Sequence, residues 1–219
     1  MAPLKTVACI PDFCGGNLYT YVGNDPANKT DPKGLYNCLK GSEAQCDVVD
    51  KAIAQARASE KNMSKKQADK AEAALKFIGT RGDKNSVVVS GGKTERDAIA
   101  TTATANGVTN ITINAKITSI GGMQRSAGVS AGGVITHEGQ HGIDETTVLK
   151  GRDHRTYTNQ ERFDTERRAY TTQSYVERAL HYADSGLYPL NDPNPASNGW
   201  SNATNRAWTV AGAEDVTLW

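Results

Sequence analysis

His137-Glu138-Gly139-Gln140-His141 is the stretch of this 219-residue chain that most strongly constrains its fold. Residues four apart lie on the same face of an α-helix, one turn above the other. Two imidazoles at that spacing can bind one zinc ion, and the Glu beside the first can reach the water on that ion. The pattern predicts a helix with a site for metal-assisted hydrolysis, most often of peptide bonds. The alternative is an exposed helix that carries these residues by chance.

The residues around the motif indicate a helix packed inside the protein. Ser130 is suited to cap its N-terminus, and Gly142 follows the second His, where a C-terminal glycine is common. Gly132, Gly133 and Gly139 each weaken a helix by roughly 1 kcal/mol relative to Ala. Such glycines usually let another backbone segment approach closely, which is consistent with a cramped site.

A catalytic zinc ion takes three protein ligands and leaves a fourth position open, so a third ligand must come from elsewhere. Asp144 and Thr147 stand where a metzincin has a Gly and a third His, which excludes that class. The downstream residues that could provide the ligand are Asp144, Glu145, His154, Glu161, Asp164, Glu166 and His181.

Helical phase favours Glu166 among these candidates. Residues 158–183 read as one helix, which begins with the capping-box sequence Thr158-Asn159-Gln160-Glu161 and so gives that Glu a structural role. Glu166 lies three residues after Phe163 and four before Tyr170, within the apolar face. A carboxylate there is costly unless it is paired or binds a metal. We expect Glu166 to be the third ligand, with an ion pair to an Arg across a helix interface as the alternative.

His137-Glu138-x-x-His141 followed by Glu166-Arg167-Arg168-Ala169 resembles the pattern of gluzincin-type zinc metallopeptidases, H-E-x-x-H and then E-x-x-A on a second helix. The resemblance implies His137, His141 and Glu166 as zinc ligands and Glu138 as the general base. It also implies a zincin-like α+β fold, in which the active-site helix and a second ligand helix pack beside a small, mostly antiparallel sheet.

The chain departs from the gluzincin pattern at Tyr170, where many members have an acidic residue. Asp144 and Glu145 are possible substitutes, since a ligating His commonly donates its other N–H to a carboxylate. The residues eligible to stabilise the oxyanion are His154, Tyr157, Tyr170 and His181.

Two motifs near the start, Leu18-Tyr19-Thr20-Tyr21-Val22-Gly23-Asn24-Asp25-Pro26 and Asp31-Pro32-Lys33-Gly34-Leu35, resemble the end of the core region of Rhs (YD-repeat) proteins. In that family the sequence beyond this boundary is a variable toxin domain. The resemblance implies that residues 1–35 are a remnant of the core region and that 36–219 are a zinc metallopeptidase-like toxin domain. It also implies use against competing bacteria and a cognate immunity protein as partner.

The composition of the chain limits the kinds of partner that it is expected to bind. The net charge is +1, so nothing indicates a nucleic-acid surface. No apolar run approaches the roughly 20 residues that span a bilayer, and the first ten residues do not form a standard secretory signal. We expect a secreted or delivered effector that acts in the cytoplasm of the target cell. The spacing of Cys9, Cys14, Cys38 and Cys46 matches no zinc finger, and a reducing cytosol favours free thiols over the two disulfides that are possible.

The rest of the chain is assigned from its periodicity. Helices are predicted at 42–59 and 64–78, a strand at 85–90, a short helix at 94–105 and a strand at 108–120. By analogy with zinc peptidases of the resembled type, the strand at 108–120 is the candidate to pair with an extended substrate.

The sequence thus predicts a zinc-dependent metallopeptidase toxin that hydrolyses peptide bonds in target-cell proteins, with Glu138 assisting attack by zinc-bound water. Two alternatives remain open: a zinc amidase acting on cell-wall peptide, and a non-enzymatic module with a structural metal site. In the latter, His154 could be a fourth ligand.

Overall fold

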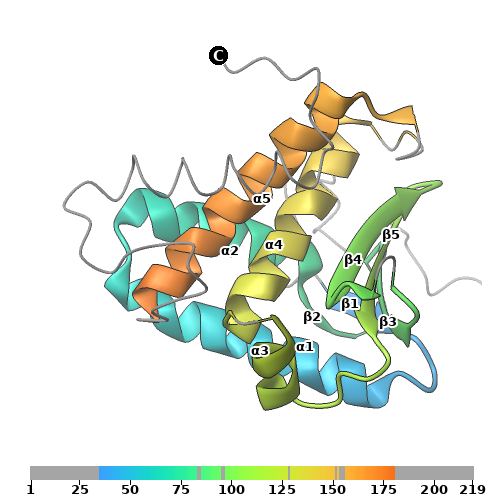
Figure 1. Ribbon diagram of the computed structural model, residues 1–219, viewed down its shortest axis with the longest axis horizontal. Coiled ribbons are helices and arrows are strands. Elements are labelled where there is room, and N and C mark those ends of the chain that lie inside the picture. The colour runs from blue at the N-terminus through green and yellow to red at the C-terminus, as the bar shows by residue number, and fades with distance from the viewer. Residues whose placement is uncertain are drawn as a thin grey trace, which may run out of the picture. The chain divides into compact units, whose positions relative to one another are not determined.

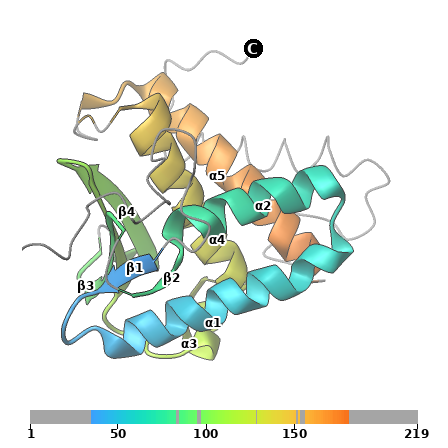
Figure 2. The ribbon, with the colours of Figure 1, turned by 180° about the vertical axis from the view of Figure 1, so that it is seen from behind.

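A computed structural model describes residues 35–82, 85–94, 97–127, 129–150, 152 and 156–180, which belong to one compact unit. In these residues the helices gather on one side of a five-stranded sheet (Figure 1), as the view from behind also shows (Figure 2). The fold of the described part is α+β, as predicted. The Rhs-like motif up to Gly34, Cys9, Cys14, His154 and His181 lie outside the described residues.

The elements in chain order are β1 (Leu35–Cys38), α1 (Glu43–Ser59), a 3-10 turn (Glu60–Asn62), α2 (Lys65–Ile78), β2 (Thr80–Arg81), β3 (Val87–Gly92), β4 (Ala100–Ala105), β5 (Val108–Asn114), α3 (Ile120–Ala127), α4 (Ala131–Ile143), a π-helical segment (Asp144–Val148) and α5 (Asn159–Ala179). None of the described helices is long and apolar enough to cross a membrane.

The sheet has the strand order β2-β1-β3-β5-β4 and is parallel except for the antiparallel pair β4 and β5. The prediction of a mostly antiparallel sheet is therefore wrong. Parallel strands need a long crossover connection, usually helical. Helices α1 and α2, both predicted from periodicity, supply such a connection between β1 and the strands that flank it.

The predicted helix at 94–105 is also wrong, because Ala100–Ala105 forms β4. Strand β4 turns into β5 through Asn106 and Gly107, whose φ angles are 52° and 76°. Positive φ at both central residues defines a type I′ hairpin turn, for which Asn-Gly is the preferred sequence. The predicted strand at 108–120 is shorter than expected, since β5 ends at Asn114 and α3 begins at Ile120.

Helix α4 lies at the centre of the helical layer and contacts α1, α2, α3, α5 and β4. Its glycines permit this close packing. A Cβ atom built on Gly139 would lie 2.4 Å from the carbonyl oxygen of Ala74 in α2, and one on Gly132 would lie 2.9 Å from the backbone nitrogen of Ala56 in α1. The expectation of close approach by another backbone segment is confirmed for Gly132 and Gly139, whereas Gly133 makes room for the side chain of Glu177.

The predicted helix caps are mostly present. The Ser130 side chain accepts a hydrogen bond from the backbone N–H of Gly133, and Thr158 and Glu161 form a complete capping box. Gly142, in contrast, does not end its helix, because α4 runs to Ile143 and continues as the π-helical segment. Gly142 instead makes room for the ring of Phe77, which would lie 2.1 Å from a Cβ atom there.

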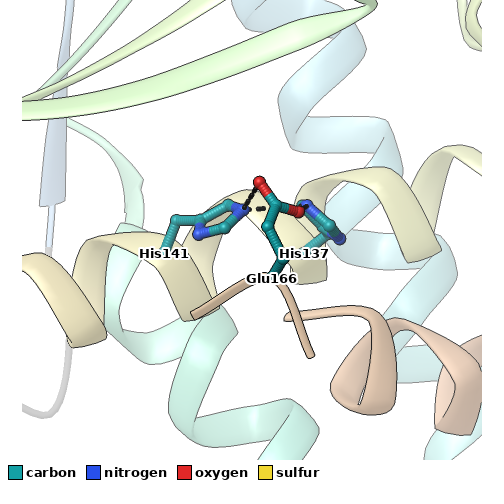
Figure 3. Close-up of side chains that lie close together, drawn as sticks. All are labelled: His137, His141 and Glu166. Carbon is teal, nitrogen blue, oxygen red and sulfur yellow. Dashed lines mark hydrogen bonds and ion pairs between the residues drawn. The ribbon is translucent and has the colours of Figure 1, made fainter. Parts of the chain in front are cut away.

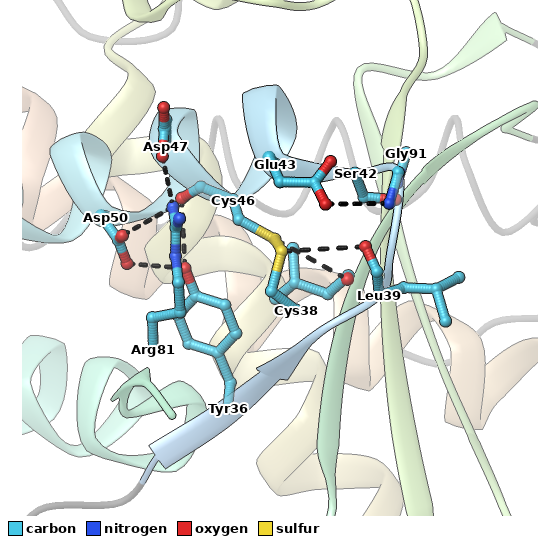
Figure 4. Close-up of a disulfide and its surroundings, with 12 residues drawn as sticks. Tyr36, Cys38, Leu39, Ser42, Glu43, Cys46, Asp47, Asp50, Arg81 and Gly91 are labelled. Atoms are coloured by element: carbon cyan, nitrogen blue, oxygen red, sulfur yellow. Dashed lines mark hydrogen bonds and ion pairs between the residues drawn. A yellow bond between two sulfur atoms is a disulfide. The ribbon is translucent and has the colours of Figure 1, made fainter. Parts of the chain in front are cut away.

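Strand β1 is tied covalently to α1 by a disulfide between Cys38 and Cys46 (Figure 4). Beside it, the hydroxyl of Tyr36 donates to Asp50 at 2.6 Å and to the carbonyl of Cys46 at 3.1 Å. Arg81 of β2 forms ion pairs with Asp50 and with Asp47, one turn earlier in α1. The expectation of free thiols is therefore wrong for Cys38 and Cys46.

Candidate metal centre

Helices α4 and α5 run antiparallel, and polar contacts along their length fix their register. Arg168 of α5 donates to both carboxylate oxygens of Asp144 at 3.0 Å, just beyond the end of α4. Nearer the middle of α4, Thr172 donates to Gln140 at 3.2 Å. At the start of α4, the carboxylate of Glu177 accepts hydrogen bonds from Ser130.

Next to these contacts, His137, His141 and Glu166 point toward one another (Figure 3). The two Nε2 atoms are 2.9 Å apart, and each lies 3.6 Å from one oxygen of Glu166. Ligands at zinc's usual bond lengths, arranged as a tetrahedron, are about 3.3 Å from one another. The three donor atoms therefore have a spacing that suits a single metal ion, and they form the one such cluster in the described residues.

The charges of the cluster also favour a cation. Burial opposes ionisation of Glu166, but the charge and hydrogen bond of His141 outweigh it and lower the pKa of Glu166 to about 2. Burial likewise lowers the pKa of His141, but Glu166 and the nearby carboxylates raise it to about 9. Acidic groups thus dominate the site, and a metal ion would supply the positive charge that the imidazole otherwise takes up as a proton.

Glu138, next to the first His, lies on the side of α4 that meets the sheet. It is 6% exposed, and its Oε2 accepts a hydrogen bond of 2.7 Å from the hydroxyl of Thr102 in β4. Burial raises the pKa of Glu138 to about 7, against the lowering effects of His141 and Thr102. A carboxylate with such a pKa can both accept and release a proton near neutral pH.

The other candidate ligands of α5 and the end of α4 have different partners. Both carboxylate oxygens of Asp144 accept from Arg168, and one of them also accepts from Gln140. Glu161 caps α5, and Asp164 contacts Arg167 and Gln160.

Glu145 is buried, and its charge contributes to raising the pKa of His141. It therefore stays a candidate for the acidic neighbour that the sequence predicts.

Tyr170 is in contact with the metal cluster. Its ring meets the ring of His137 edge to face, with 4.5 Å between the centroids. Tyr157 instead donates its hydroxyl to the carbonyl of Arg152. Of the residues eligible to stabilise an oxyanion, Tyr170 is thus the described one that touches a candidate ligand.

Two residues that support the site were missed by sequence reasoning. Thr102 falls in the segment predicted as a helix, although the Asn106-Gly107 pair is typical of a hairpin. Glu177 follows Glu166 by eleven residues, about three helical turns, and so lies on the same face of α5. Glu177 therefore shares the helical phase that favours Glu166 as a ligand, but it binds the N-cap of α4 instead.

Comparison with known proteins adds no relative: no family model, no curated protein and no solved structure matches this chain.

Proposed function

We propose that this protein is a zinc-dependent metallopeptidase. The observation that carries the proposal is the convergence of His137, His141 and Glu166 with Glu138 directly beside the first ligand. Two imidazoles and one carboxylate are the ligands of many catalytic zinc sites. The same donor set also binds iron(II) in oxygenases. A carboxylate directly after the first His is the position of the general base in zinc peptidases of the H-E-x-x-H type, so we favour zinc.

Zinc in such a site acts as a Lewis acid toward water and toward the carbonyl of the scissile bond. The protein contributes the proton transfers. Glu138 takes a proton from the attacking water as the oxygen bonds to the carbonyl carbon, and it delivers that proton to the nitrogen as the C–N bond breaks. Tyr170 is the proposed donor to the oxyanion because its ring lies against His137.

The substrate strand proposed from sequence needs correction. Strand β5 lies between β3 and β4, so its backbone is already paired on both sides. Strand β4 is the edge of the described sheet next to α4, and an extended peptide could add to it by β-augmentation. We propose that β4, rather than β5, binds the substrate backbone.

The biological setting rests on sequence. The motifs in residues 18–35 support a toxin domain attached to an Rhs core, delivered to competing bacteria and neutralised by a cognate immunity protein. The proposed target is a protein in the cytoplasm of the recipient cell. The Cys38–Cys46 disulfide favours a second candidate, since disulfides persist in oxidising compartments. That candidate is an amidase acting on cell-wall peptide outside the cytoplasm.

The test combines metal analysis with identification of new N-termini. Purified protein should contain one zinc per chain, and so should the Glu138→Gln variant, because Glu138 is not a ligand. Cells that produce the wild type should accumulate new protein N-termini, whereas cells with Glu138→Gln should not. Glu72→Gln, which changes a carboxylate in α2, is the matched control and should behave as wild type.

Four results would reject or redirect the proposal. Protein without metal, or a Glu138→Gln variant that still produces the same N-termini, would contradict a metallopeptidase. Unfolding on chelation together with unchanged toxicity of Glu138→Gln would indicate a structural metal site. Release of cell-wall peptides without new protein N-termini would favour the amidase.

A further inference from the structure

Thr102 is the polar residue through which the edge strand contacts the proposed general base. Its Oγ1 lies 2.7 Å from Oε2 of Glu138 and 3.2 Å from the main-chain carbonyl oxygen of the same residue. On the sheet it is aligned with Ile111 of β5 and, through it, with Val89 of β3. Both neighbours are fully buried and apolar, so Thr102 ends an apolar row with a hydroxyl directed at α4.

The backbone of Thr102 faces the other way. In an antiparallel pair, alternate residues exchange hydrogen bonds with the partner strand. The two-residue hairpin makes Ala105 and Val108 such a pair, and Asn114 donates to the carbonyl of Ile99 at 3.0 Å with the same parity. Thr102, three residues before Ala105, belongs to the other set, whose residues do not exchange hydrogen bonds with β5. Its N–H and C=O therefore point away from β5, toward the side where the described residues provide no further strand.

We infer that Thr102 is a positioning residue that holds the carboxylate of Glu138 at a set place relative to strand β4. The inference rests on the proposed function and adds to it a link between peptide binding along β4 and the position of Glu138. A peptide paired along β4 would hydrogen-bond to the backbone of Thr102, while the side chain of the same residue holds the base. One residue would thus set the distance between Glu138 and the bound peptide backbone.

Three substitutions separate this role from a structural one. Thr102→Val keeps the β-branched shape and removes the hydroxyl, and Thr102→Ser keeps the hydroxyl. Thr112→Val removes a hydroxyl from the outer face of β5, where Thr112 contacts Ser90 rather than the site. All three are compared with wild type and with Glu138→Gln.

The first readout uses metal-free protein and needs no substrate. The carboxyl carbon of Glu138 is observed by ¹³C NMR and assigned by its absence in Glu138→Gln. Thr102→Val should shift this resonance, and Thr102→Ser and Thr112→Val should leave it in place. An unchanged resonance in Thr102→Val would overturn the inference, because the hydrogen bond would then be absent in solution.

The second readout is hydrolysis by zinc-loaded protein of a peptide library prepared from a bacterial proteome, followed by kinetics on one cleaved peptide. Thr102→Val should lower kcat by about 10- to 100-fold with KM and zinc content unchanged, as is typical when a supporting hydrogen bond is lost. Thr102→Ser should restore most of kcat. A Thr102→Val variant with wild-type kcat, with a change in KM alone or with loss of zinc would overturn the inference.

The experiment distinguishes failure of the proposed function from failure of the role of Thr102. If wild type cleaves no peptide, the proposed function fails and the role of Thr102 fails with it. If wild type is active and Glu138→Gln is not, the proposed function stands, and Thr102→Val alone decides the inference.

Discussion

Reduction of the Cys38–Cys46 disulfide should weaken the fold by a predictable amount. The two cysteines are eight positions apart, and the bond joins β1 to α1. In the chain-entropy description, closing so short a loop lowers the entropy of the unfolded chain by about 8 cal/mol/K, or about 2.5 kcal/mol at 25 °C. Domains are typically stable by only about 5–15 kcal/mol, so this is a substantial share of the total.

Urea unfolding followed by circular dichroism measures this loss. Wild type should unfold at lower urea in the presence of a reductant, with a free energy of unfolding lower by about 2.5 kcal/mol. Cys38→Ala/Cys46→Ala is the control, because it lacks this bond and keeps Cys9 and Cys14. Its unfolding should not respond to the reductant. Equal stability of oxidised and reduced wild type would refute the reasoning, as would an equally large response in the double variant.

Three further predictions concern the site and its packing. His141→Ala should lose both zinc and activity, measured by metal analysis and peptide hydrolysis, and retention of one zinc per chain would contradict its role as a ligand. Burial raises the pKa of Glu177 to about 7, so its contribution to stability is present below about pH 4.5 and lost as pH rises through 7. The unfolding free energy of wild type should therefore fall by at most about 3 kcal/mol between pH 4.5 and pH 8, and Glu177→Gln should not show this fall. A pH profile in Glu177→Gln identical to that of wild type would contradict this. Gly139→Ala should destabilise the protein by about 2 kcal/mol in urea unfolding despite the helix propensity of Ala, because the Cβ atom would lie 2.4 Å from the backbone of Ala74. Gly121→Ala should not destabilise the protein, because the nearest atom to its Cβ would be in an Arg side chain at 3.4 Å. An equal loss of unfolding free energy in the two variants would refute the packing argument.

The cluster of candidate ligands could be predicted because its signals are local. The spacing of His137 and His141 places them on one helical face, and the position of Glu166 within an apolar face calls for a partner. Each inference needs only the geometry of a single helix. The structure adds what one helix cannot show, namely that α4 and α5 dock so that the three groups meet.

The sheet could be predicted only in part because strand pairing depends on residues far apart in sequence. Periodicity located β3 and β5 but carried no information on their direction or neighbours. Strand β4 is different, since its Thr and Ala residues and the Asn106-Gly107 turn were present in the sequence as a hairpin signal. Because residues 94–105 are predicted as a helix, the strand that brings Thr102 to Glu138 is not predicted.

The place of β1 in the sheet limits where this domain can be separated from whatever precedes it. Residues 35–38 form an interior strand, with β2 on one side and β3 on the other. A protease that cut after Cys38 would leave this strand joined covalently to α1 only through Cys46, and reduction of that disulfide would then release it from between its two neighbours. Under reducing conditions, processing that preserves the folded domain must therefore take place upstream of this strand.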